Sequence, residues 1–170
     1  VYWGDPSQLD KVGVSHWSYA GIPPLVAARE ALLEAGHSPP HIGMFYDTTT
    51  LERNAWHEHV DLTTLRGQAW YYESIRDYFS LIPPHHWALI DHKPVVFTWS
   101  AGWAKQYDQA HVDVAKRRFS EDFGGKPFYL VKEVSWNIEA DDVYAWGGAF
   151  ALRPLSVASL GPGYDHSNVP

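Results

Sequence analysis

Apolar residues recur at helical spacing in three parts of the chain. Leu25, Ala28 and Leu32 fall at positions i, i+3 and i+7, after a Pro23-Pro24 pair suited to a first helical turn and before Gly36, which is typical of a C-terminal cap. Two later segments show the same period and end before Pro83-Pro84 and Gly124-Gly125. The pattern predicts three amphipathic helices, one to Ala35, one over 65–79 and one over 112–123.

Short apolar runs alternate with these helices and read as strands. They cover 12–14, 41–46, 93–99, 128–131, 144–150 and 155–160. Lys93-Pro94 and Lys126-Pro127 begin two of the runs and enclose one predicted helix, which is the arrangement of a βαβ unit of parallel strands. We therefore predict one α/β domain over residues 1–170. Because a (β/α)8 TIM barrel needs about 250 residues, we expect this chain to hold only part of one.

Composition restricts the classes of partner, cofactor and ligand that fit this chain. The net charge of -7 disfavours nucleic acid and anionic membranes as partners, because both need clustered Lys and Arg. The chain has no cysteine, phosphate loop or dinucleotide fingerprint, so we expect no cofactor. Nine Trp and ten Tyr exceed what core packing needs, which favours a ligand that stacks on aromatic rings. No apolar run is long enough to cross a membrane, and we expect a secreted or periplasmic protein whose export signal has been removed.

Acidic residues that follow the predicted strands are the first candidates for chemistry, because sites of parallel α/β folds lie at the carboxyl ends of the strands. Glu133 ends an apolar strand, a place that suits a general acid. Asp47, Glu139 and Asp141 compete as the second carboxylate. Asp47 equally fits a helix cap. Asp142 competes with Glu139 and Asp141, and a solvated acidic loop accounts for at least two of these three, so the sequence does not choose among them.

Aromatic and polar residues near the same strand ends are candidates for binding a ligand. Trp99, Trp103, Trp136 and Trp146 are candidate sugar platforms, although each alone fits core packing, and we expect about half of them to reach a ligand. A second set with polar atoms for hydrogen bonding comprises His16, Trp17, Tyr46 and Asp165.

The ten histidines raise the question of a metal. His57-Glu58-His59 and His85-His86 are the densest groups, but the chain has no His-Glu-x-x-His motif and no third ligand at a telling spacing. We expect no metal in the site, and a metal-dependent hydrolase remains a weaker alternative.

Several short segments together resemble bacterial glycosyl hydrolase-like proteins, with glycoside hydrolase families 71 and 99 as characterised relatives. They are Gly13-Val14-Ser15-His16-Trp17, Gly43-Met44-Phe45-Tyr46-Asp47-Thr48, Lys93-Pro94-Val95-Val96-Phe97-Thr98-Trp99, Ser135-Trp136-Asn137, Tyr144-Ala145-Trp146-Gly147 and Gly161-Pro162-Gly163-Tyr164-Asp165. The resemblance implies a (β/α)8 barrel, endo-acting cleavage of an α-linked glycan, and a chain that is the N-terminal or central part of a longer enzyme.

The sequence therefore leaves two leading candidate functions. The first is a glycosidase in which Glu133 and a second acid act on a carbohydrate substrate. The second is a carbohydrate-binding protein on a degenerate barrel, with aromatic platforms and no working acid pair. Substitution of Glu133 by Gln separates them, since only the first has turnover to lose.

Overall fold

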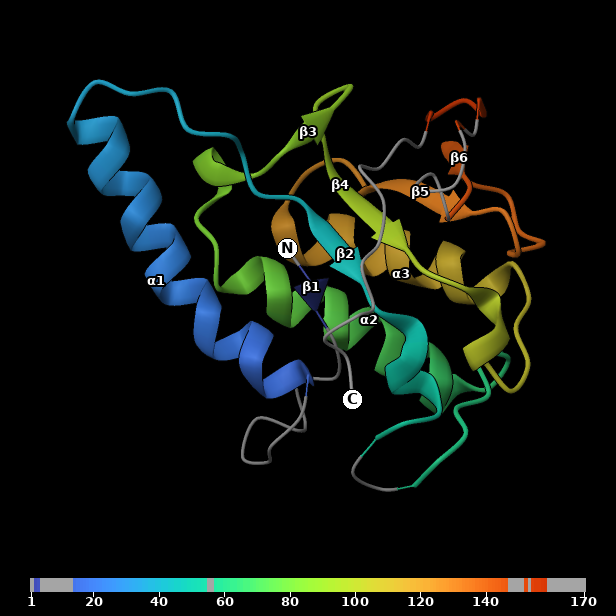
Figure 1. Ribbon diagram of the computed structural model, residues 1–170. Coiled ribbons are helices and arrows are strands. Elements are labelled where there is room, and N and C mark those ends of the chain that lie inside the picture. The colour runs from blue at the N-terminus through green and yellow to red at the C-terminus, as the bar shows by residue number, and fades with distance from the viewer. Residues whose placement is uncertain (1, 4–13, 55–56, 147–151, 153, 159–170) are drawn as a thin grey trace, which may run out of the picture.

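Two of the three predicted helices form as the apolar period indicates. The computed structural model describes residues 2–3, 14–54, 57–146, 152 and 154–158 (Figure 1). Helix α2, Leu65–Ser80, is capped by Thr64, whose hydroxyl accepts the N–H of Gly67 at 3.1 Å. Helix α3, Ala110–Phe123, ends at Gly124 in the left-handed conformation, with φ 64°. Local sequence was sufficient to predict both helices.

The first helix differs from its prediction at the N-terminal end. Helix α1 runs over Val14–Glu34, so Pro23 and Pro24 lie inside it instead of in its first turn. The predicted strand over 12–14 is therefore wrong at Val14, while residues 12 and 13 lie outside the described part. Each internal proline removes one backbone hydrogen bond from the helix, which continues through both of them.

In the described part of the chain, the sheet contains five parallel strands in chain order, β1-β2-β4-β5-β6. Their bounds are Tyr2–Trp3 for β1, Met44–Tyr46 for β2, Lys93–Thr98 for β4, Tyr129–Glu133 for β5 and Asp142–Tyr144 for β6. A further strand, β3, Leu89–Ile90, pairs antiparallel with the start of β4. The connections among the described residues contain the 3₁₀ helices η2 Thr48–Leu51, η3 Pro84–His86 and η4 Ala101–Trp103. The chain thus has an α/β fold built on a parallel sheet.

The last two predicted strands are displaced. The strand predicted over 144–150 forms earlier in the chain. Strand β6 ends at Tyr144, the residue where the predicted strand began, and Trp146 is in a bend. No strand forms over 155–158, where only single hydrogen bonds reach β6, among them Val157 N–H to the Val143 carbonyl at 3.0 Å. Residues 147–151 and 159–165, including Asp165, lie outside the described part. Within that part the sheet is open, and it does not close into a barrel.

Helices α2 and α3 lie together on one side of the sheet, and α1 stands beside its β1 edge (Figure 1). The main core lies between the sheet and helices α2 and α3, and it includes Met44, Val96 and Leu130 from the central strands. Within the described residues, no helix is both long and apolar enough to cross a membrane.

The opposite face of the sheet carries a second, smaller apolar cluster. Val95, Val131 and Tyr144 form its buried part, and Phe45 and Phe97 pack against them. Phe45, Phe97 and Val131 occupy one register row across β2, β4 and β5, so their side chains point to the same face. The candidate site extends from this face.

Candidate active site at the carboxyl ends of the strands

The strand register brings two acids and two aromatic residues into one row at the carboxyl edge of the sheet. Tyr46 pairs with Thr98, and Thr98 with Lys132, so the next row holds Asp47, Trp99 and Glu133. Tyr144 completes that row, because it pairs directly with Glu133. Neighbouring strands lie about 4.8 Å apart, which puts the Cα atoms of Asp47 and Glu133 roughly 10 Å apart. Side chains alternate along strands, so this row projects on the same face as Phe45, Phe97 and Val131.

Glu133 is buried, with 7% of its surface exposed. The backbone N–H of Ser135 donates to Oε2 at 2.9 Å, and the Ser135 hydroxyl donates to the same oxygen. That hydroxyl in turn accepts the N–H of Ala101 at 2.9 Å. Residues from the ends of β4 and β5 therefore fix the orientation of this carboxylate.

Asp47 is also buried, with 3% exposed, at the N-cap of η2. Its Oδ1 accepts the Thr49 N–H at 3.0 Å and the Thr49 hydroxyl at 2.9 Å. Burial raises the pKa of Asp47 above its ordinary value of 3.8, and the two Thr49 hydrogen bonds offset only part of that rise. A carboxyl whose pKa is raised in this way keeps its proton to a higher pH than a free one, as a general acid must.

Three indole rings gather beside this row. The Trp99 ring centroid lies 6.0 Å from those of both Trp103 and Trp146, and Trp146 lies 5.8 Å from Phe45. Trp146 is 55% exposed, so much of its ring faces solvent. The guanidinium of Arg53 sits 4.8 Å from the Trp103 ring centroid, a contact that no local sequence signal indicated.

Two of the predicted binding residues belong to the core instead. Tyr46 is fully buried on the helix side of the sheet, and Trp136 is 2% exposed. The Trp136 indole N–H donates to the Trp99 carbonyl, and its ring packs 4.7 Å from that of Tyr107. Neither ring is accessible to a sugar, so Trp136 does not serve as a predicted platform and Tyr46 does not serve as a predicted hydrogen-bonding residue.

The two remaining acids lie apart from the row. Asp141 contacts Lys93, the first residue of β4, at 3.0 Å and Lys116 at 2.5 Å, and accepts the Leu130 N–H at 2.9 Å. It therefore lies towards the amino ends of the strands, away from Glu133. Burial alone would raise the pKa of Asp141, but these three donors outweigh it and hold the pKa below 3.8. Glu139 is exposed on the connecting loop. Asp141 is thus a structural ion-pair partner, and the structure does not support it as the second acid.

Tyr144 is a residue that sequence reasoning missed. Its hydroxyl donates to the Thr98 carbonyl at 3.1 Å, and burial, followed by the charge of Glu133, raises its pKa. Its position beside Glu133 follows from strand register, which has no local signal. For His16 and Trp17 the structure gives only their backbone in the first turns of α1, and Asp165 is outside the described part.

Potential metal ligands gather elsewhere in the described residues. Glu30, His85 and His86 bring one ligand atom each to within 4.8 Å of one another. The group is next to Ile42, just before β2, since the Ile42 N–H donates to the His86 carbonyl at 2.8 Å. It therefore lies towards the amino ends of the strands. No such group of three forms around Glu133 among the residues described.

Sequence comparison places the chain in a family. Residues 1–167 match the family described as "Domain of unknown function (DUF5010)". No curated protein and no solved structure matches the chain.

Proposed function

We propose that this chain, which belongs to the DUF5010 family, is part of a glycoside hydrolase in which Glu133 and Asp47 are the two catalytic carboxylates. The observation that carries the proposal is the row of Asp47, Trp99 and Glu133 at the carboxyl edge of the sheet. It combines two buried acids with an indole ring, which are the groups that glycosidic bond cleavage uses.

Asp47, whose pKa is raised by burial, is the better candidate for the general acid. Ser135 donates two hydrogen bonds to Oε2 of Glu133, which fixes the carboxylate plane and leaves Oε1 as the oxygen that accepts a proton from water. Glu133, two strands away from Asp47, then serves as the base.

The three indoles supply the sugar platforms. Trp146 is the most accessible of them, and Trp99 connects it to Trp103. Pyranose rings present apolar C–H faces that stack on such rings while their hydroxyls remain hydrated. A neutral or weakly charged glycan also fits a chain with a net charge of -7.

The same strand order supports a (β/α)8 barrel. Five parallel strands follow the chain order without reversal, and α2 and α3 cover one face only, as each segment of such a barrel requires. The opposite face, with Phe45, Phe97 and Val131, would then face the barrel interior. The remaining strands would come from a longer chain, and a polymeric glycan as substrate favours a secreted or periplasmic location.

The decisive experiment measures reducing-sugar release by the full-length natural protein on a panel of α- and β-linked polysaccharides. Glu133→Gln keeps the acceptor for Ser135 but cannot ionise, so we expect kcat to fall by about 100-fold or more. The matched control is Glu139→Gln on the same loop, where we expect wild-type turnover. Equal activity of both variants and the wild type would refute the role of Glu133.

A carbohydrate-binding protein without turnover is the second candidate, and one observation favours it. Both buried carboxylates accept hydrogen bonds from neighbours two residues along the chain, Glu133 from Ser135 and Asp47 from Thr49, as structural acids do. In that case no polysaccharide is cleaved, and sugar titration changes the tryptophan fluorescence of the wild type and of Glu133→Gln alike.

A further inference from the structure

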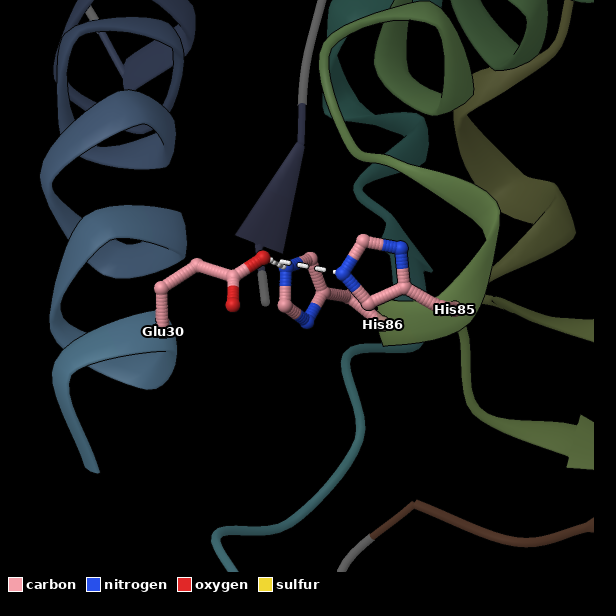
Figure 2. Close-up of side chains that lie close together, drawn as sticks. All are labelled: Glu30, His85 and His86. Carbon is pink, nitrogen blue, oxygen red and sulfur yellow. Dashed lines mark hydrogen bonds and ion pairs between the residues drawn. The ribbon is translucent and has the colours of Figure 1, made fainter. Parts of the chain in front are cut away.

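A cluster of potential metal ligands joins α1 to η3. It lies towards the amino ends of the strands, whereas the candidate active site lies at their carboxyl ends. Figure 2 shows the Glu30 carboxylate reaching from α1 towards the imidazoles of His85 and His86. Oε1 of Glu30 lies 2.6 Å from Nε2 of His86 and 2.9 Å from Nε2 of His85. The three side chains converge although α1 and η3 are far apart in sequence.

The cluster is built from one buried and two accessible ligands. His86 is wholly buried, whereas the side chains of His85 and Glu30 are 61% and 41% exposed. The site therefore has a fixed inner wall and an open side through which an ion can enter.

We propose that Glu30, His85 and His86 bind a divalent transition-metal ion, with Zn²⁺ as the best-fitting ion. Two imidazole nitrogens and one carboxylate oxygen form a ligand set that suits Zn²⁺ and disfavours Mg²⁺ and Ca²⁺, which prefer oxygen ligands only. Donor atoms around a tetrahedral Zn²⁺ lie about 3.4 Å apart, given metal–ligand bonds of about 2.1 Å. The present separations differ from this by less than about 1.5 Å, which side-chain rotation can supply, and water takes the fourth position on the exposed side.

The neighbouring Arg29 lowers the affinity of this cluster for a metal ion. Its Nη1 donates to Nδ1 of His86, so the ring proton lies on Nε2, the atom that faces Glu30. A metal ion at Nε2 moves that proton to Nδ1, and Arg29 must then give up this contact while its Nε keeps the Pro40 carbonyl at 2.9 Å. We therefore expect a site weaker than a cysteine-rich zinc centre.

The bound ion would act as a clamp instead of a catalyst. It would link α1, on which Leu25, Leu32 and Leu33 are exposed, to the η3 segment that precedes β3 and β4. Because a preformed ligand cluster binds the ion only when α1 is docked, binding would stabilise the folded protein.

The test is isothermal titration of the EDTA-treated protein with ZnCl₂ and, separately, MgCl₂, together with thermal melting. We expect one equivalent of Zn²⁺ to bind and to raise Tm, with no effect of Mg²⁺. His85→Ala and Glu30→Gln each remove an accessible ligand without opening the core, and each should weaken Zn²⁺ binding by about tenfold or more.

His59→Ala is the matched control, because His57 and His59 form a separate exposed pair that adventitious Zn²⁺ would use. Unchanged binding in His59→Ala, with loss in both cluster variants, supports the clamp. The proposal is overturned if the wild type binds no Zn²⁺, if His85→Ala and Glu30→Gln bind it as the wild type does, or if only His59→Ala weakens binding. None of these outcomes bears on Glu133, so the two proposals stand or fall separately.

Discussion

The backbone N–H of Trp99 donates to the carbonyl oxygen of Tyr46 at 3.1 Å, and this bond is the last of the ladder between β2 and β4. The residues that follow the ladder, Asp47 on one strand and Trp99 on the other, therefore leave the sheet side by side. The bond holds the acid beside an aromatic platform, although the two residues are more than 50 positions apart in the chain, and the predictions for the site depend on it.

Substitution of Asp47 separates a catalytic role from a capping role. Asp47→Asn keeps an oxygen for the Thr49 N–H but cannot ionise, so we expect kcat on a cleaved polysaccharide to fall by about 100-fold with no loss of melting temperature. Asp47→Ala also removes the cap and should cost about 1 kcal/mol of stability in addition. Kinetics and chemical denaturation of both variants give the two effects separately.

The pH dependence supplies an independent check on Asp47. Its pKa is raised in the fold, so the folded state binds more protons, and the wild type loses stability as pH rises from 3.8 through the folded pKa. Asp47→Asn has no such loss. Its stability relative to the wild type should therefore be higher at pH 7 than at pH 3, and an identical difference at both pH values would show that burial does not perturb this carboxyl.

Trp146 is predicted to contribute binding and not chemistry. Its exposed ring packs on Trp99 and Phe45, so Trp146→Ala removes a platform and leaves the carboxylates in place. We expect KM to rise roughly fivefold, equivalent to about 1 kcal/mol of lost stacking, with kcat nearly unchanged. Val134→Ala, at another exposed apolar residue, should leave both constants at wild-type values. A fall in kcat without a change in KM would place Trp146 in the catalytic step.

Much of this arrangement was accessible from the sequence, because it depends on local pattern. The apolar period predicted α2 and α3, and the rule that sites follow parallel strands selected Asp47, Trp99 and Glu133. The parts that failed depend on long-range packing. Trp136 was indistinguishable from Trp99 in local context, yet the loop after β5 folds it against Tyr107 in the core.

Connections without helices account for the other failures. Strands β5 and β6 are parallel but joined by a short loop, so the chain must return to the amino edge of the sheet within it, and Asp141 is carried there to Lys93 and Lys116. The contact between Glu30 and His85 could not be predicted from local sequence either, because it depends on how α1 packs beside the sheet.

Asp141 is predicted to support stability in a pH-dependent way. Its pKa lies below 3.8 in the fold, so the stabilisation is complete above pH 3.8 and is lost as pH falls through the folded pKa. Asp141→Asn keeps an acceptor for the Leu130 N–H but loses the charge, which we expect to cost about 1–3 kcal/mol at pH 7. The cost should shrink towards zero near pH 2, and urea denaturation at both pH values measures it. A cost that does not change with pH would mean that the two lysines contribute nothing.

Gly67 is predicted to be the glycine that tolerates a side chain least. It lies in the first turn of α2, where an added Cβ would sit 2.0 Å from the carbonyl oxygen and 2.7 Å from the carbonyl carbon of Asp61. Those atoms are backbone, and the Asp61 carbonyl also accepts the Thr64 hydroxyl at 2.8 Å, so the clash forces the turn and the helix cap apart. We expect Gly67→Ala to cost about 3 kcal/mol or more, in line with overpacking and the loss of a cap.

Gly21→Ala is the control for helix propensity, since Gly21 also lies within a helix but a Cβ there meets no atom within 4 Å. Alanine is the better helix former, so this change should stabilise the protein by about 0.5–1 kcal/mol. Thermal melting of both variants tests the packing between α2 and the turn that precedes it. If Gly67→Ala melts at or above the temperature of Gly21→Ala, the close approach of Asp61 to α2 is wrong, and so is the way α2 packs against β2.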